Sequence, residues 1–332
     1  MPFLRQTGVF AAAFFLMPVL PPHLFCFGFG YSARALARRL LSQGWRITGT
    51  CRSAESEEAL RAEGVATQLF GPGRPFPSSA FAGASHILVS IPPQKEGDLV
   101  LDTYGKEIAA LESLAWLGYL SSTAVYGDQG GGWVDESSPL LPKSLRARQR
   151  ASAEEGWLSL KRERGQPVHI FRLAAIYGPG RSAFEALRAG TAKRIDKPQQ
   201  LFSRIHVEDL ARLLEASIAR PRPGAVYNVA DDEPAAPEAV VLYAARLLGV
   251  PPPPLLPLEK AALSPLAKSF YDDNKRVRND LIKKEFSFRL GYPDYRAGLA
   301  SILHSPEISC RKPRARSSSS KQKSREGKEK CP

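Results

Sequence analysis

Residues 24–33 read Leu24-Phe25-Cys26-Phe27-Gly28-Phe29-Gly30-Tyr31-Ser32-Ala33, an apolar run that breaks into a G-x-G-x-x-A turn. The Ala/Leu/Arg pattern that follows predicts a helix with one apolar face. A dinucleotide pyrophosphate needs free N–H groups at a helix N-terminus, one Gly for the tight turn, a second for close approach, and a small third residue where helix meets strand. Gly28, Gly30 and Ala33 fill these roles. The stretch therefore predicts a strand, a nucleotide-binding turn and a helix, with an ordinary structural turn as the alternative.

The next predicted strand, residues 45–52, bears on which dinucleotide binds. An NAD-selective site places an acid about twenty residues beyond the glycines, but Arg52 and Ser53 stand there. A guanidinium and a hydroxyl suit a ribose 2′-phosphate, so we expect NADP, with NAD as the second option. A solvated Arg52 at the start of a loop is the alternative. The full set of expected cofactor contacts is Gly28, Phe29, Gly30, Tyr31, Ser32, Ala33, Arg52, Ser53 and Ser90.

The net charge of +13 on the 332-residue chain is unevenly distributed. Residues 305–332 hold nine Lys/Arg and three acids, so +6 lies in this segment and +7 elsewhere. This segment has no apolar periodicity, and we expect it to be a disordered basic tail. A tail-based nucleic-acid-binding protein is a third reading of the chain, but we expect no specific nucleic-acid partner.

The four cysteines, at positions 26, 51, 310 and 331, have no metal-binding spacing and suit a reducing cytoplasm. Residues 1–22 resemble a signal peptide in having Arg5 before an apolar run, but the run is too short to span a bilayer and no small-x-small cleavage site follows. We treat them as a leader of uncertain status and expect no membrane association.

Strand and helix patterns alternate through the middle of the chain, which predicts an α/β fold with a Rossmann-type, doubly wound parallel sheet. The Rossmann domain would cover residues 23–304, with roughly 181–304 as a smaller C-terminal substrate-binding part. Expected strands are 65–70, 86–90, 117–121 and 168–173, and expected helices are 103–113, 144–164, 207–219, 237–248 and 295–303.

Several segments in this order resemble the extended short-chain dehydrogenase/reductases, in their NAD-dependent epimerase/dehydratase branch. The segments that carry the resemblance are residues 28–30, 120–128 (LSSTAVYGD), 171–180 (FRLAAIYGPG), 204–210 (RIHVEDL) and 226–231 (VYNVAD). The resemblance covers roughly residues 23–304. It implies a nicotinamide cofactor, a small polar, sugar-like substrate in the C-terminal part, and an assembly for which a homodimer stays open.

The resemblance also implies catalytic positions, and two of them depart from the family pattern. In the family, a Ser or Thr four residues before the tyrosine of the Val-Tyr-Gly segment binds the reacting oxygen, and here that position is Ser122. The family's Tyr-x-x-x-Lys pair falls on Arg146 and Arg150. Arginine is a poor proton acceptor near neutral pH, so Arg146 cannot replace the tyrosine, whereas Arg150 could hold the ribose or a phosphate. A solvated basic helix face is the alternative.

Other residues could supply the proton. Tyr126 and Tyr177 follow predicted strands at the edge where doubly wound sheets bind ligands, although both could equally pack structurally. His206 precedes a predicted helix and could contact a substrate or cap that helix. Two main readings of the chain follow: an NADP(H)-preferring oxidoreductase or epimerase-like enzyme, or a non-catalytic NAD(P)-binding protein that lacks the acid/base pair.

Overall fold

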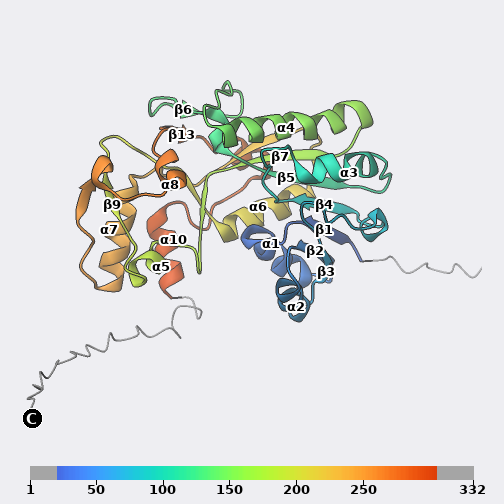
Figure 1. Cartoon of the computed structure of the whole chain (residues 1–332), viewed down its shortest axis with the longest axis horizontal. Coiled ribbons are helices and arrows are strands. Elements are labelled where there is room, and N and C mark those ends of the chain that lie inside the picture. Colours follow the sequence, from blue (N-terminus) through green and yellow to red (C-terminus); the bar gives the residue numbers. More distant parts are fainter. Residues whose placement is uncertain (1–20, 305–332) are drawn as a thin grey trace, which may run out of the picture.

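A sheet of seven parallel strands forms the centre of the computed structural model, which describes residues 21–304 (Figure 1). The strand order is β11-β7-β5-β4-β1-β2-β3. From β1 to β3 the strands are added on one side of β1, and from β4 to β11 they are added on its other side. The topological switch point therefore lies between β1 and β4, and doubly wound sheets bind their ligands at this point. The strands are β1 His23–Phe27, β2 Arg46–Cys51, β3 Ala66–Leu69, β4 His86–Val89, β5 Trp116–Ser122, β7 Val168–Leu173 and β11 Val226–Val229.

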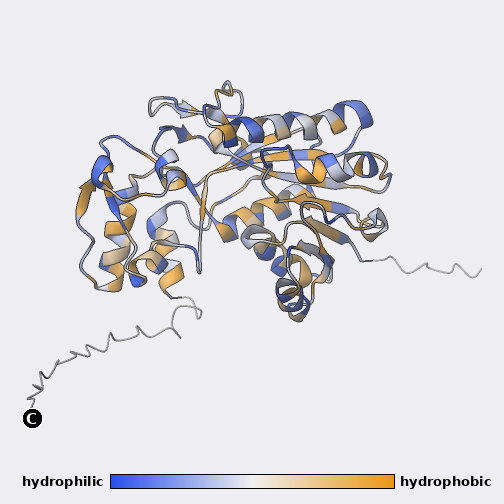
Figure 2. Cartoon of the chain, in the orientation of Figure 1, coloured by the Kyte–Doolittle hydropathy of each residue, from blue (hydrophilic) through white to orange (hydrophobic). Residues whose placement is uncertain are grey.

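Helices cover both faces of this sheet (Figure 1). Leu24 and Cys26 of β1 pack in a core shared with α1 (Tyr31–Leu41), α6 (Val207–Ala219) and α9 (Asp280–Phe286). Phe25 and Phe27, which point to the opposite face, pack against α3 (Leu99–Ala109) and α4 (Leu145–Arg164). Because both faces are covered, the central strands are almost wholly apolar, as the colouring in Figure 2 shows. The predicted fold class is confirmed.

A smaller C-terminal lobe lies beside the sheet, on the left in Figure 1. Its core joins α5, α7 and α10 through residues such as Phe184, Ala244 and Leu299. Residues 181–304 also return to the main sheet, because α6 and β11 belong to it. The lobe elements are α5 Ala183–Arg188, β9 Arg194–Asp196, α7 Pro237–Leu248, β12 Leu255–Pro257, α8 Pro265–Ser269 and α10 Tyr295–Leu303.

Short elements connect the two parts. Three parallel pairs lie outside the main sheet: β9 with β12 in the lobe, β8 with β10, and β6 with β13. The remaining elements are α2 Ala54–Ala62, β6 Trp133–Val134, β8 Ala175–Tyr177, β10 Arg204–His206, β13 Arg276–Val277, and the 3-10 turns η1 Ser78–Ala80, η2 Thr123–Tyr126 and η3 Leu258–Lys260.

The structure confirms the predicted helices 207–219, 237–248 and 295–303 and finds the long helix α4 one residue later than its predicted start, with Ser144 as its cap. The prediction of a helix at 103–113 was wrong by four residues: α3 spans Leu99–Ala109. The reason is Asp98, whose carboxylate accepts hydrogen bonds from the N–H groups of Val100 and Leu101 and so begins the helix earlier.

Among residues 21–304, no helix is long and apolar enough to cross a membrane. The expectations for the basic tail and for nearly all of the leader concern residues 305–332 and 1–20, which lie outside the described part of the chain.

Candidate functional site

The turn after β1 has two glycines that serve different purposes. Gly28 has a φ of 85°, and a Cβ there would lie 2.8 Å from both Ile91 Cγ1 and Ser90 Oγ. Backbone conformation and packing therefore both require glycine at position 28. Gly30 has an ordinary φ of −92°, and a Cβ on it would meet no described atom within 4 Å. Neither conformation nor packing requires glycine at position 30, and the space in front of its backbone is open.

Gly30 is also the N-cap residue of α1, and no side chain caps this helix end. Helix N-termini without a capping side chain leave N–H groups that can bind an anion. The open space at Gly30 therefore lies next to helix N–H groups that no side chain caps.

Residues from the two neighbouring strands hold this turn in place. Thr50, in β2, accepts hydrogen bonds from the N–H of Gly28 through its hydroxyl (2.7 Å) and from the N–H of Phe29 through its carbonyl (3.0 Å). On the other side, the Ser90 hydroxyl donates to the carbonyl of Gly28 (2.7 Å). Sequence reasoning selected Ser90 but missed Thr50, whose position one residue before the end of its strand could have pointed to it.

Three other predicted contact residues direct their side chains into the protein. Phe29 is 8% exposed and packs where a Cβ on Gly49 would otherwise lie. Ser32 and Ala33 are buried in the first turn of α1. Their side chains are therefore not free to contact a ligand at the surface of the turn.

Tyr31 connects the turn to a distant segment. Its hydroxyl donates to the carbonyl of Pro179 (3.0 Å), and the guanidinium of Arg181 lies over its ring. Burial raises the pKa of the Tyr31 phenol to about 12, so it remains protonated at neutral pH. The segment after β8 is thereby fixed next to the start of α1.

The two predicted cofactor contacts after β2, Arg52 and Ser53, differ in their contacts with the rest of the protein. Arg52 is exposed and makes no hydrogen bond or ion pair with another described residue. Ser53 is the N-cap of α2, where its hydroxyl accepts from the N–H of Ser56 (3.3 Å). Arg74, which sequence reasoning missed, lies at the turn after β3, the strand that pairs with β2. Burial raises the pKa of the Cys51 thiol at the end of β2, and the charge of Arg74 is among those that oppose this shift.

The end of β5 carries a buried polar network. The Ser121 hydroxyl donates to Glu154, which lies in α4 and forms a buried ion pair with Arg172 of β7 (2.9 Å). Arg172 also donates to the hydroxyl of Tyr126 (2.9 Å), and Tyr126 donates to Asn228 (2.8 Å). The network ties β5, β7 and β11 to α4.

Tyr126 is a member of this network and is completely buried. Burial raises the pKa of its phenol, against the opposing effect of the Arg172 charge. Its hydroxyl group is held by Arg172 and Asn228 and has no access to solvent, which favours the structural alternative over proton transfer.

Ser122 and the two arginines of α4 lie at or near the exposed edge. The Ser122 hydroxyl accepts from the N–H of Ala124 (3.2 Å) and caps η2, while the residue stays half-buried. Arg146 is exposed. Arg150 is half-buried and donates to the carbonyl of Leu120 (2.8 Å) and the hydroxyl of Tyr119 (3.2 Å), so it is fixed at the carboxyl end of β5.

The two other candidates from the sequence have structural contacts. Tyr177 is buried and donates to the carbonyl of Asp294 (3.2 Å), and burial raises the pKa of its phenol. His206 accepts from the N–H of Glu208 (3.3 Å) as the N-cap of α6, and burial lowers the pKa of its imidazole to about 4. Its other ring nitrogen, Nε2, is buried without a described partner.

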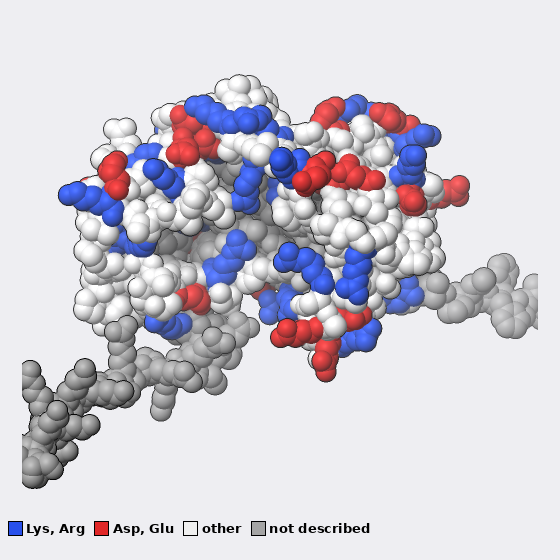
Figure 3. All heavy atoms as spheres, viewed as in Figure 1, with Lys and Arg blue, Asp and Glu red and all other residues white. Residues whose placement is uncertain are grey.

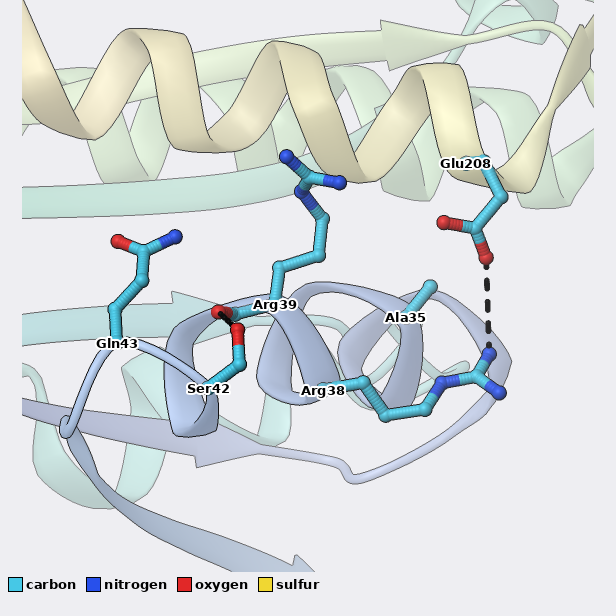
Figure 4. Close-up of a pocket in the computed structure, with 6 residues that line it drawn as sticks. All are labelled: Ala35, Arg38, Arg39, Ser42, Gln43 and Glu208. Atoms are coloured by element: carbon cyan, nitrogen blue, oxygen red, sulfur yellow. Dashed lines mark hydrogen bonds and ion pairs between the residues drawn. The ribbon is translucent and has the colours of Figure 1, made fainter.

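A surface groove of about 410 Å³ lies between α1 and α6 (Figure 4). Its charged side chains satisfy one another: Arg39 pairs with Glu215 (2.6 Å) and Arg38 with Glu208 (3.8 Å). The groove follows the second half of α1, away from the Gly28–Gly30 turn, and offers no reactive group.

The sequence was compared with protein families and with known proteins. The family model of the NAD dependent epimerase/dehydratase family matches residues 108–230. Protein YeeZ of Escherichia coli K12 is 28% identical over 282 residues, which is 80% of this chain and 95% of that protein.

Solved structures share the fold. A conserved protein of unknown function from Silicibacter pomeroyi is 52% identical, with a TM-score of 0.80 over 85% of this chain and 98% of that one. The dTDP-glucose 4,6-dehydratase from Bacillus anthracis in complex with NAD is 16% identical, with a TM-score of 0.68 over 85% and 95% of the two chains. Over residues 108–230 the chain therefore matches the NAD-dependent epimerase/dehydratase family, and it shares its fold with an enzyme of known structure that binds NAD.

Proposed function

We propose that this protein is an NADP(H)-preferring oxidoreductase or epimerase-like enzyme of its family that acts on a small polar molecule. The observation that carries the proposal is Gly30, a glycine that neither its φ of −92° nor its surroundings require. A ligand whose phosphates approach the backbone closely explains it. When bound, the nicotinamide would accept or supply a hydride.

The preference for NADP(H) is supported by the cations beyond β2 and β3. Arg52 has no partner within residues 21–304, and Arg74 lies in the turn after β3, the strand that pairs with β2. An unpaired guanidinium next to the ribose position favours a 2′-phosphate. Lys and Arg side chains also surround the hollow at the centre of the face in Figure 3, which suits an anionic cofactor.

The residues of α4 and β5 would then position the cofactor and substrate. Arg150 is fixed beside the carboxyl end of β5, where it could hold a ribose or phosphate oxygen. The half-buried hydroxyl of Ser122 can donate to a reacting oxygen. The cytoplasm is the compartment we propose, because it supplies nicotinamide cofactors.

A non-catalytic NAD(P)-binding protein is the second candidate, and one observation favours it. The position of the family's catalytic tyrosine holds the exposed Arg146, and the nearest tyrosine at the strand end, Tyr126, is fully buried. A protein that binds cofactor but never turns it over would fit this arrangement.

A matched pair of glycine variants tests cofactor binding. Gly30→Leu would place a side chain in the open space while the backbone keeps an ordinary conformation. Gly83→Leu is the control, because Gly83 also has open space and no positive φ. We expect both variants to fold, and only Gly30→Leu to lose NADP(H) binding. Equal binding by both variants would refute the proposed site.

Turnover separates the two candidate functions. NADPH oxidation by the wild type would be followed with a panel of small carbonyl compounds and sugar derivatives. Substrate-dependent oxidation that disappears in Gly30→Leu supports the enzyme. Tight NADPH binding without oxidation across the panel supports the non-catalytic protein.

A further inference from the structure

We propose that a cavity in the C-terminal lobe binds the carboxylate of a small apolar acid, with Arg204 as the anion-binding group. The cavity has a volume of about 380 Å³ and lies between β8, α5, α7 and α10. The residues used in this argument that line it are Tyr177, Ala186, Arg204, Val240, Tyr295 and Leu299. This inference goes beyond the proposed function, because it concerns a ligand site that can be studied without cofactor.

Arg204 is a nearly buried cation with donors to spare. It is 9% exposed, and its Nη1 donates to the carbonyls of Phe202 (2.8 Å) and Ala235 (3.1 Å), which fix the guanidinium. No residue within 21–304 accepts a hydrogen bond from its Nε or Nη2. The Nε–Nη2 edge is therefore available, and such a planar guanidinium edge fits a carboxylate through two parallel hydrogen bonds.

The acid nearest to this cation does not neutralise it by direct contact. Asp231 is 1% exposed, and no side chain in the described part of the chain donates a hydrogen bond to its carboxylate. Burial raises the pKa of Asp231 to about 8, although the Arg204 charge opposes the shift. Asp231 forms no direct ion pair with Arg204 in the described part of the chain, so the Nε–Nη2 edge of the guanidinium stays available to another anion.

The other charges on the cavity wall do not compete for the same ligand. The carboxylate of Glu185 accepts from both the N–H and the hydroxyl of Ser182 (2.6 Å each) in the capping box of α5. Arg181 is exposed and lies over the ring of Tyr31. An incoming anion thus meets a second cation, Arg181, and one carboxylate, Glu185, whose hydrogen bonds are used in the capping box of α5.

The remaining walls of the cavity indicate which kind of group the ligand carries besides its carboxylate. Two tyrosine rings, Tyr177 and Tyr295, and the aliphatic side chains of Val240 and Leu299 surround the cationic end. The Tyr177 hydroxyl is already used by the carbonyl of Asp294. An aromatic or aliphatic acid fits such walls, whereas the many hydroxyls of a sugar would find few partners.

Titration calorimetry on the full chain tests the site with a defined probe. The probe is 3-phenylpropanoate, and its neutral amide, 3-phenylpropanamide, is the matched ligand. We expect saturable binding of the acid and binding of the amide weaker by about tenfold or more, since the amide loses the charge-assisted contact. No saturable binding of the acid, or equal affinities for acid and amide, would overturn the proposal.

Variants locate the binding in the cavity. Arg204→Gln should weaken binding of the acid by about tenfold or more. Arg194→Gln is the control in the same lobe, because it removes a cation that is paired with Glu238, and it should leave binding of the acid unchanged. Because Arg204→Gln could unfold the lobe, Ala186→Leu provides an independent check: it fills the cavity and keeps Arg204. Binding of the acid to a folded Ala186→Leu variant at wild-type affinity would place the site elsewhere.

The outcome is independent of the proposed enzyme. Each variant is also titrated with NADP(H), whose site lies at the Gly28–Gly30 turn. Loss of acid binding with retained cofactor binding supports the cavity site. Acid binding lost only together with cofactor binding would show that the two are one site and would overturn the inference.

Discussion

The hydroxyl of Thr50 accepts a 2.7 Å hydrogen bond from the N–H of Gly28 and so fixes the turn that begins α1. Thr50→Val keeps the shape of the side chain but leaves this N–H without its partner. We expect a loss of about 0.5–1.5 kcal/mol in the free energy of unfolding and weaker NADP(H) binding, because the turn becomes less well ordered. Urea unfolding and calorimetry measure the two effects.

Thr48→Val is the control for this prediction, because Thr48 lies in the same strand and contacts His23 (2.8 Å) rather than the turn. It should cost similar stability and leave cofactor affinity unchanged. If both variants weaken the cofactor equally, Thr50 acts through general stability alone.

Tyr126→Phe tests the structural role of this residue. The variant removes a hydroxyl that accepts from Arg172 and donates to Asn228, both buried, so we expect it to cost about 1–3 kcal/mol of stability. NADP(H) binding and any turnover should survive. A variant as stable as the wild type that has lost only turnover would instead make Tyr126 the proton donor.

Arg150→Met tests the residue at the family's lysine position. We expect cofactor affinity to fall by about tenfold, the loss of one charge-assisted hydrogen bond, because Arg150 is fixed at the end of β5. Arg146→Met, four residues earlier on the same helix and exposed, is the control and should bind normally. The prediction fails if the two substitutions have the same effect on affinity.

Sequence patterns predicted most of the fold. The helices 207–219 and 237–248 could be predicted because their apolar residues recur at helical spacing. The Gly28–Gly30 turn could be predicted because its motif lies within a few consecutive residues. The strand pair β6 and β13 could not be found, because each has two residues and exists only through pairing between distant segments.

The site was less predictable for the same physical reason. Arg52 could be selected from its place after a strand, since exposure and charge are local properties. The burial of Tyr126 depends on Arg172 and Asn228, which are 46 and 102 residues away. Likewise, no local pattern shows that Asp231 is buried, because its surroundings come from several elements.

Asp231→Asn should change how stability depends on pH. Burial raises the pKa of Asp231 from 3.8 to about 8. Between these values the folded protein keeps a proton that the unfolded chain releases, so this group makes the free energy of unfolding fall as pH rises.

The Asp231→Asn variant lacks this titrating group. Its free energy of unfolding minus that of the wild type should therefore increase by up to about 1.4 kcal/mol per pH unit between about pH 4 and about pH 8. Urea unfolding across this range measures the difference. Asp232→Asn, which changes the exposed neighbouring acid, should follow the wild-type slope. A constant difference between wild type and Asp231→Asn over the range would contradict the buried, proton-bearing carboxyl.

Titration calorimetry of NADP(H) and NAD(H) with the wild type and Arg52→Ala tests the central claim most directly. We predict tighter binding of NADP(H) than of NAD(H) by the wild type. Arg52→Ala should lose about 1.5–3 kcal/mol of NADP(H) binding and leave NAD(H) binding unchanged, because only the 2′-phosphate pairs with the guanidinium. Absence of binding by either cofactor would contradict the account and make the Gly28–Gly30 turn a structural feature.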